Sequence, residues 1–236
     1  MSVGLAVEDS SEFTFEDVAV VMGTYNEAAA VGRVLADVAD VTDGEASAIC
    51  VDGSSDRTAE IARDHGATVI EQEPQGYGVA VQAALEAADR PVVVTTDCDD
   101  TYPMERLPDF LDLINDGYDV VSGDRLRRGA EHMPALNRVG NRVFAGIASL
   151  LAGDRVRDVT TGMRAYRRDV IEAIDWTENT GLSAELLLRP LMREYRVCEV
   201  PIDYDERAGE TTLDPLRGGL AIGKSIASVC LQERRR

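Results

Sequence analysis

Short hydrophobic runs alternate with segments of helical periodicity through the first half of the chain. Five runs have the length of buried strands: 18–22, 46–51, 67–71, 91–96 and 118–122. The segments between them predict helices: one beginning near Asn26, one from Ser54 or Ser55 to Gly66, one after Gly78 to Ala88, and one over 104–115. Strands that alternate with helices predict an α/β fold with a mostly parallel central sheet and helices on both faces.

The second half of the chain is less regular. It predicts helices at 135–151, 183–194 and 215–232, a strand at 197–203, and an arginine-rich loop after the first of these helices. Residues 1–16 are polar, acidic and aperiodic, so we expect a flexible tail there. The length after it, 17–236, suits a single domain.

The charge of the chain is strongly acidic. The 236 residues include 43 acidic and 24 basic side chains, giving a net charge of −19, and Lys224 is the only lysine. An acidic, lysine-poor surface is typical of salt-loving archaea, whose proteins stay soluble through a hydrated acidic shell. The composition excludes a general nucleic-acid-binding protein, because such proteins carry an overall basic surface.

A basic region interrupts this acidic background. Residues 121–170 contain 10 arginines against 5 acidic residues. The planar guanidinium favours bidentate contacts with phosphate, so one interpretation is an anionic ligand or a lipid headgroup. The other is that these arginines pair with the acidic surface beside them, and the sequence leaves both open.

The cysteine content and the hydropathy of the chain indicate its cellular compartment. Four cysteines without CxxC spacing, with two histidines, predict reduced thiols and neither a zinc site nor a disulfide framework. No signal-peptide pattern precedes 17, and no apolar run reaches 18 residues. We therefore expect a cytoplasmic protein, at most peripheral to the cytoplasmic face of a membrane.

The strand at 91–96 ends in a cluster of carboxylates, Asp97, Asp99 and Asp100. Unpaired, they would carry like-charge and desolvation costs at the end of an apolar strand. Hard carboxylate oxygens suit Mg²⁺ or Mn²⁺, which also take phosphate oxygens. The carboxyl end of a strand is also where open α/β sheets bind ligands. An acidic turn on an acidic protein is the alternative.

Two further strands end in polar turns. Gly23-Thr24-Tyr25-Asn26-Glu27 follows the first strand, and Asp52-Gly53-Ser54-Ser55-Asp56-Arg57-Thr58 follows the second. Both turns offer groups that can bind a ribose, a base or a phosphate. Taken alone, each is better explained as a helix cap, through Asn26 in the first case.

In order along the chain, these turns resemble a known family. Thr-Tyr-Asn-Glu, Asp-Gly-Ser-Ser-Asp-Arg-Thr, Gly76-Tyr77-Gly78 and Asp97-Cys98-Asp99 are similar to the blocks of the inverting family 2 glycosyltransferases of GT-A fold. Blocks at 117–125, 158–164 and 199–213 resemble the polyprenyl-phosphate hexosyltransferase branch, which includes the dolichyl-phosphate mannose and glucose synthases. The resemblance covers about residues 18–222.

The resemblance implies a site and a reaction. A hexose would pass from UDP-glucose or GDP-mannose to a polyprenyl (dolichyl) phosphate, with Mg²⁺ or Mn²⁺ held by Asp97 and Asp99. It divides the domain into a nucleotide-sugar half, 17–122, and an acceptor half, 123–236. The residues it implies for binding the donor are Thr24, Asn26, Glu27, Asp52, Gly76, Asp97 and Arg207. For the acceptor phosphate it implies Arg125 and Arg138, with Glu185 as the base if one is used and Asp158 as an orienting residue.

Four positions depart from the usual pattern of this family. Gly23 stands where proline is usual, and Val51-Asp52 where an acidic pair is frequent. Tyr77 and Thr212 stand where lysines are frequent, so the phosphate contacts differ from the usual set.

Three other functions fit part of the pattern. Strand–Asp97-x-Asp99-x-Thr101 also resembles the nucleophile loop of haloacid-dehalogenase-type phosphatases, in which Asp97 would form an aspartyl phosphate. That chemistry needs a downstream lysine and acidic pair, and Lys224 has no acidic pair after it. A non-catalytic nucleotide-sugar-binding module and a glycosyltransferase with a glycan or small phosphorylated acceptor are the others.

The helix at 135–151 bears on membrane contact. It mixes hydrophobic residues with Arg138 and Arg142, a composition shared by interfacial helices and by core helices flanked by arginines. We expect mainly a core helix, with the arginine-rich region touching anionic lipid.

Overall fold

A single seven-stranded sheet forms the centre of the protein. The computed structural model describes residues 12–128, 132–206 and 215–236, with side chains from Gly218 onward in the last range. Within them the strand order is β3-β2-β1-β4-β6-β5-β7. The strands are β1 (Val18–Thr24), β2 (Ser47–Asp52), β3 (Thr68–Glu71), β4 (Val92–Thr95), β5 (Val120–Asp124), β6 (Arg164–Arg167) and β7 (Val197–Pro201). Only β6 runs antiparallel to its neighbours, β4 and β5.

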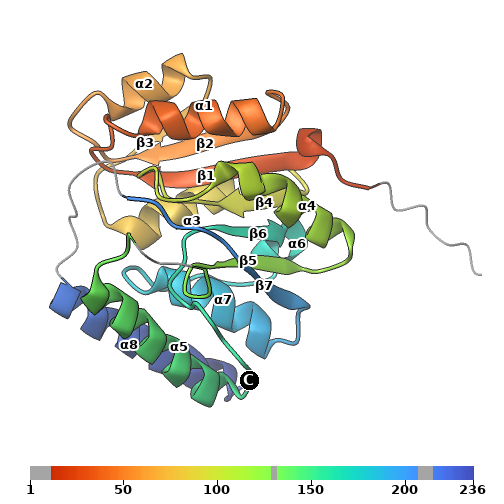
Figure 1. The fold of residues 1–236 in the computed structure, drawn as a ribbon, viewed down its shortest axis with the longest axis vertical. Helices are drawn as coiled ribbons and strands as arrows, with labels where there is room; N and C mark the ends of the chain where they lie inside the picture. The colour runs from red at the N-terminus through yellow and green to blue at the C-terminus, as the bar shows by residue number, and fades with distance from the viewer. Residues whose placement is uncertain (1–11, 129–131, 207–214) are drawn as a thin grey trace, which may run out of the picture.

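Helices cover both faces of the sheet (Figure 1). One face packs against α1 (Val31–Val41), α2 (Thr58–Asp64) and α4 (Leu107–Asn115), and the other against α3 (Tyr77–Ala87), α6 (Arg168–Glu172) and α7 (Leu182–Met192). Strand β1 shows why: Val18, Val20 and Met22 enter the first core, whereas Ala19 and Val21 enter the second. Successive side chains of a strand point to opposite faces, so a strand buried on both faces is hydrophobic throughout.

Two long helices form a further layer outside α7. Helices α5 (Ala135–Ala152) and α8 (Pro215–Glu233) lie side by side at the lower left of Figure 1 and share a third hydrophobic cluster with α7. Short 3₁₀ helices η1 (Phe15–Asp17) and η2 (Met104–Arg106) complete the described elements. Among the residues described, no helix combines the length and hydrophobicity needed to cross a bilayer.

The predicted α/β architecture is confirmed, with two corrections. The sequence pattern missed β6 and α6 and predicted a loop there, because Arg164 looks like a surface residue. Its side chain is fully buried instead, and its Nε donates to Ser122 Oγ at 3.0 Å. The predicted flexible tail is wrong for Phe13: its N–H and C=O both pair with the Asn115 side chain, at 2.9 and 3.0 Å. Residues 1–11 lie outside the described part.

Candidate active site

A cleft of about 720 Å³ opens at the carboxyl ends of β1, β2 and β4. These strands are neighbours in the sheet, so the three polar turns that follow them lie together, as expected for a ligand site in an open α/β fold. The segment before α7 closes the other side. The lining includes Gly23, Thr24, Tyr25, Glu27, Gly53, Gln72, Gly76, Tyr77, Asp97, Cys98, Asp99, Thr160, Asn179, Thr180, Gly181, Ser183 and Ile222.

The turns after β1 and β2 hold each other through side chains. The Asn26 N–H donates to Ser54 Oγ at 2.7 Å, and Asn26 Oδ1 accepts from the Ser55 N–H at 3.0 Å. The Glu27 N–H donates to Thr58 Oγ1 at 2.9 Å. Asn26 has a φ of 57°, a left-handed conformation that asparagine tolerates. Asn26 therefore links two turns and does not cap its own helix, which begins at Val31.

The helix after β2 begins later than predicted and is capped by a different residue. Helix α2 begins at Thr58, and Asp56 Oδ1 accepts from the Thr58 N–H at 2.9 Å, so neither Ser54 nor Ser55 is the N-cap. Ser54 instead binds the end of the preceding strand, its Oγ donating to Asp52 Oδ1 at 2.6 Å.

Thr24 and Asp52 form a buried pair beneath these turns. The Thr24 hydroxyl donates to Asp52 Oδ1 at 2.6 Å, and both residues are 3% exposed. Asp52 Oδ2 accepts from the Ser54 N–H at 3.1 Å. Both carboxylate oxygens thus have protein donors, and Asp52 fixes the shape of the turn in this structure.

Asp97 and Asp99 both line the cleft, and each is oriented by a hydroxyl. The Tyr77 hydroxyl donates to Asp97 Oδ1 at 3.0 Å, and the Thr101 hydroxyl donates to Asp99 Oδ1 at 2.6 Å. Burial, followed by the charge of Asp97, raises the pKa of Tyr77 well above its ordinary value, so the phenol remains a donor. Tyr77 therefore has a positioning contact where the family frequently has lysine.

The chemistry of these two side chains fits a divalent cation. They supply hard carboxylate oxygens from one short turn at the cleft wall. Within the described residues no group of three or more His, Cys, Asp or Glu side chains is placed to hold a metal ion. A cation bound here would thus rely on ligand oxygens from phosphate or water, as Mg²⁺ usually does.

The Gly-Tyr-Gly turn packs against the segment before α7. The Gly78 N–H donates to Asn179 Oδ1 at 2.9 Å, and Asn179 Nδ2 donates to the Gln75 carbonyl at 2.9 Å. A Cβ on Gly78 would lie 2.4 Å from the Asn179 carbonyl oxygen, so only glycine permits this approach. Gly76, with a φ of 106°, caps α3 and also lines the cleft. Asn179 was not predicted as a site residue. The polar run Thr177–Thr180 directly before a helix could have indicated it.

The structure thus divides the predicted donor-binding residues into three groups. Thr24, Glu27, Gly76 and Asp97 line the cleft, together with the predicted metal ligand Asp99. Asn26 and Asp52 hold the two turns in place beside it. Arg207 lies outside the described residues.

Arg125 is engaged inside the protein. Its Nε and Nη2 form a bidentate ion pair with Asp158 at 2.7 and 3.0 Å, Nη2 also donates to Thr160 Oγ1, and Nη1 donates to the Tyr102 hydroxyl. Its Cζ lies 5.2 Å from the Tyr204 ring centroid. These contacts use four of the five N–H groups of the guanidinium. Arg125 thus braces the wall behind Thr160 in this structure, and one N–H group is left for the acceptor phosphate that we predicted it to bind.

The other acceptor residue, Arg138, lies in the first turn of α5 and is half-buried. It does not line the cleft.

Glu185 does not have the surroundings of a general base. Its side chain is fully buried, accepts from the backbone N–H groups of Thr177 and Glu178, and pairs with Arg189 Nε at 2.6 Å. It is also absent from the residues that line the cleft. In this structure Glu185 fixes the segment that carries Asn179.

With this geometry established, comparisons with known proteins identify the family. Residues 19–175 match the family described as "Glycosyl transferase family 2". The chain belongs to glycosyl transferase family 2. A "Dolichyl-phosphate hexose transferase" from Haloferax volcanii is 71% identical over 226 residues, covering 96% of this chain and 99% of that protein. "Glycosyltransferase AglJ" from the same organism is 36% identical over 214 residues, covering 87% of this chain and 69% of that one.

A solved structure confirms the fold. The crystal structure of glucosyl-3-phosphoglycerate synthase from Mycobacterium tuberculosis, in complex with Mn²⁺, UDP and phosphoglyceric acid, superposes with a TM-score of 0.71. It is 22% identical, and the match covers 92% of this chain and 78% of that one. The GT-A fold predicted from the motifs is therefore confirmed. The family match and the 71% identical relative show that the protein is a glycosyltransferase. The phosphatase and non-catalytic alternatives are set aside.

Proposed function

We propose that this glycosyltransferase moves a hexose from UDP-glucose or GDP-mannose to a polyprenyl (dolichyl) phosphate, with inversion, using Mg²⁺ or Mn²⁺ at Asp97 and Asp99. The observation that carries the proposal is the pair of oriented carboxylates in a cleft formed by the three strand-end turns. The acceptor class is supported by the name of the 71% identical relative, and the cation by the Mn²⁺ in the structural neighbour.

The reaction requires little more than placement and charge stabilisation. An acceptor phosphate oxygen forms a bond to the anomeric carbon while the bond from that carbon to the nucleoside diphosphate breaks. A phosphate oxygen is already a competent nucleophile, so a strong general base is unnecessary and the burial of Glu185 is no obstacle. A divalent cation, when bound, supplies Lewis-acid stabilisation of the departing diphosphate. Tyr77 and Thr101 hold the two carboxylates for it.

The acceptor is a membrane lipid, so the proposal places the protein at the cytoplasmic face of a membrane as a peripheral enzyme. Thr24 and Glu27 on one wall would contact the nucleoside of the donor. Arg207 is the proposed contact of the donor diphosphate. Arg138 and the remaining N–H group of Arg125 are the proposed contacts of the acceptor phosphate.

A transfer assay tests the proposal. Labelled UDP-glucose or GDP-mannose is incubated with a polyprenyl phosphate and Mn²⁺, and the label that partitions into organic solvent is measured. We expect label transfer that stops with chelator and falls more than about a hundredfold in Asp97→Asn and Asp99→Asn. Transfer to 3-phosphoglycerate in place of the lipid would support the alternative acceptor class.

Asp100 supplies a matched control within the same turn. It pairs with Arg33 at 2.8 Å and does not line the cleft, and asparagine tolerates its φ of 66°. Asp100→Asn should therefore transfer normally. Normal turnover by Asp99→Asn would remove the metal assignment.

A further inference from the structure

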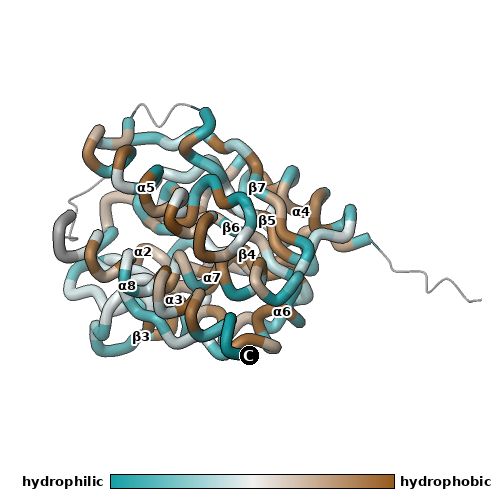
Figure 2. The backbone as a smooth tube through the Cα atoms, turned by 90° about the horizontal axis from the view of Figure 1, so that it is seen from below, coloured by the Kyte–Doolittle hydropathy of each residue, from teal (hydrophilic) through white to brown (hydrophobic). Residues whose placement is uncertain are grey.

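Helix α5 exposes a continuous hydrophobic stripe. Five of its hydrophobic side chains are between 39% and 79% exposed: Leu136, Val139, Val143, Ile147 and Leu150. Their spacing of three or four residues places them along one side of the helix. The expectation of a core helix is therefore wrong for this side, and hydrophobic and hydrophilic segments alternate along α5 in Figure 2.

The helix has three distinct faces. With 3.6 residues per turn, successive side chains are about 100° apart. Phe144, Ala148 and Leu151 enter the cluster shared with α7 and α8. The exposed stripe is centred about 110° around the helix from them. Arg138 and Arg142 are one turn apart and lie along one flank of the stripe.

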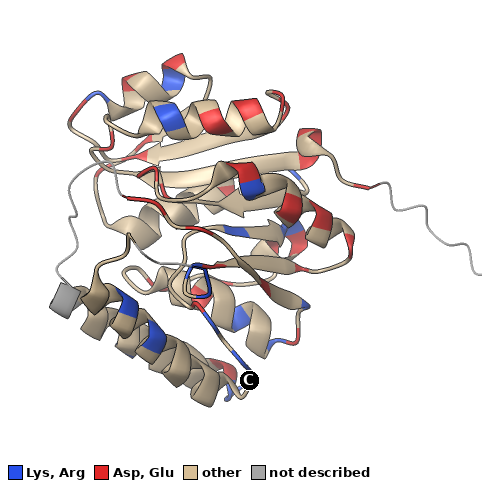
Figure 3. Ribbon diagram, viewed as in Figure 1, with Lys and Arg blue, Asp and Glu red and all other residues tan. Residues whose placement is uncertain are grey.

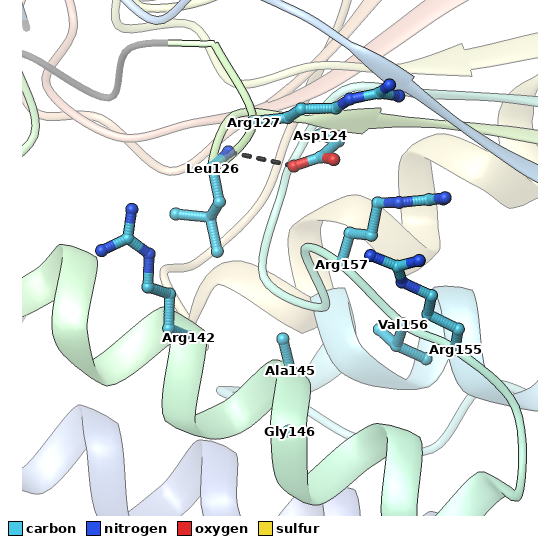
Figure 4. Close-up of a pocket in the computed structure, with 9 residues that line it drawn as sticks. All are labelled: Asp124, Leu126, Arg127, Arg142, Ala145, Gly146, Arg155, Val156 and Arg157. Atoms are coloured by element: carbon cyan, nitrogen blue, oxygen red, sulfur yellow. Dashed lines mark hydrogen bonds between the residues drawn. The ribbon is translucent and has the colours of Figure 1, made fainter.

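That flank opens into a pocket of about 440 Å³ lined by four arginines (Figure 4). Arg142 comes from α5, Arg127 from the loop after β5, and Arg155 and Arg157 from the segment before β6. Arg157 Nη1 lies 3.7 Å from Oε2 of Glu199, which is outside the pocket lining. Asp124 is the acidic residue among those that line the pocket. Within the described residues, no carboxylate oxygen lies within 4.0 Å of the Arg127, Arg142 or Arg155 guanidinium.

The charge around this surface is opposite to that of the whole protein. Helix α5 contains no Asp or Glu, although the chain carries a net charge of −19. The acidic residues of α1 and α4 lie on the other side of the molecule from α5 (Figure 3). A hydrophobic stripe beside arginines is the pattern of an interfacial helix that meets anionic lipid.

The surface is connected to the catalytic cleft through α8. Phe144 of α5 packs against Gly219 and Gly223 of α8, where a Cβ would lie 3.6 and 3.8 Å from the ring. Ile222, between these glycines, lines the cleft. A bilayer seated on α5 would thus lie next to the site that needs a lipid acceptor.

We propose that the α5 stripe and the arginine pocket beside it form a docking surface for an anionic lipid bilayer, in which the stripe enters the interfacial region and the arginines bind headgroup phosphates. The role of this surface rests on the proposed function, in which the acceptor is a lipid. Binding of the surface to a bilayer can be measured without a donor and without turnover. A second copy of the chain is the less suitable occupant, because stripe-to-stripe packing would bring two arginine-lined flanks together.

Vesicle co-sedimentation of the full chain tests the proposal. We expect binding to vesicles of phosphatidylglycerol mixed into phosphatidylcholine, and weaker binding to phosphatidylcholine alone. Val143→Asp should weaken binding by about tenfold or more, because it places a charge in the stripe. Arg142→Gln should weaken it by about fivefold in low salt and little in molar potassium chloride, where screening is strong.

Matched controls come from residues outside α5 and the arginine pocket. Ile70→Asp changes an exposed hydrophobic residue of β3, and Arg90→Gln an exposed arginine beside Asp89, and both should bind like the unchanged protein. Donor binding in Val143→Asp reports that the fold is intact.

Unchanged vesicle binding in Val143→Asp, or no binding by the unchanged protein, would overturn the proposal. The proposal would also be overturned by a dimer that Val143→Asp dissociates, or by a protein that binds inorganic phosphate but does not bind vesicles. Donor binding without vesicle binding would contradict this inference and leave the proposed function standing.

Discussion

The Tyr77 hydroxyl donates a hydrogen bond of 3.0 Å to Asp97 Oδ1. This contact joins the first residue of α3 to the carboxylate turn after β4, 20 residues later. It orients one of the two proposed metal ligands from a position where the family frequently has lysine.

Tyr77→Phe removes that hydroxyl and keeps the ring. Groups that orient a metal ligand typically change metal affinity or activity by 10- to 100-fold, so we expect about a tenfold or greater rise in the Mn²⁺ concentration needed for half-maximal transfer. A Mn²⁺ titration of turnover measures it. Tyr118→Phe, whose ring lies under Arg196, is the control. An unchanged Mn²⁺ requirement in Tyr77→Phe would show that the contact does not matter for the metal.

Gly162→Ala should displace Asp97 without unfolding the protein. The added Cβ would lie 2.6 Å from Asp97 Oδ2. Gly162 itself is held, because its N–H donates to the Tyr102 hydroxyl and its carbonyl accepts from Thr95 Oγ1. The carboxylate must therefore move, and a misplacement of about 1 Å costs on the order of a hundredfold in rate.

The measurement is the turnover number beside the midpoint of thermal unfolding. Gly140→Ala is the control, since a Cβ there has no atom within 4 Å. Full activity in Gly162→Ala would show that Asp97 has freedom to move in the active enzyme.

The Arg125–Asp158 ion pair makes the stability depend on pH. Although burial alone would raise it, the Arg125 guanidinium holds the pKa of Asp158 below its ordinary value of 3.8. The stabilisation is therefore complete above that value and is lost as the pH falls below it. Asp158→Asn leaves a buried arginine without its partner and should cost about 3–5 kcal/mol at neutral pH.

The difference in unfolding free energy between the unchanged protein and Asp158→Asn should shrink as the pH falls below about 4. Thermal or denaturant unfolding at a series of pH values measures it. A difference that stays constant down to acid-induced unfolding would show that the ionised pair is not what stabilises this wall.

Glu185→Gln separates a structural from a catalytic role. Glu185→Gln removes the negative partner of the buried Arg189, so this variant should be less stable by about 3 kcal/mol. Glu172→Gln is the matched control: it removes an exposed pair with Arg168 at the same helical spacing and should cost less than about 1 kcal/mol. A stable Glu185→Gln variant that binds the donor but does not turn over would instead make Glu185 a catalytic base.

The sequence was sufficient where a pattern is local. The runs that became β1, β2 and β4 are hydrophobic on both faces, and each is followed directly by its polar turn, so the cleft edge and the Asp97/Asp99 pair could be predicted. Apart from α6, the pattern also predicted the described α-helices, with their ends shifted by a few residues.

The sequence was insufficient where partners are distant along the chain. The buried Arg164 side chain donates a hydrogen bond to Ser122, which is 42 residues away along the chain. Arg125 is paired with Asp158, which is 33 residues away. Asn179 reaches Gly78 across 101 residues. Such pairs leave no periodic signal, so the arginines were interpreted as surface or phosphate-binding residues and Glu185 as a base.

Donor binding, measured by isothermal titration calorimetry, shows whether the cleft binds a nucleotide-sugar through a metal at Asp97 and Asp99. UDP-glucose and GDP-mannose are titrated in molar salt, with Mn²⁺ and then with chelator, into the unchanged protein, Asp99→Asn and Asp100→Asn. We predict that one donor binds only with Mn²⁺, that Asp99→Asn abolishes this binding, and that Asp100→Asn retains it. Binding of neither donor, or equal binding in the presence of chelator, would show that Asp97 and Asp99 do not hold a metal that binds the donor.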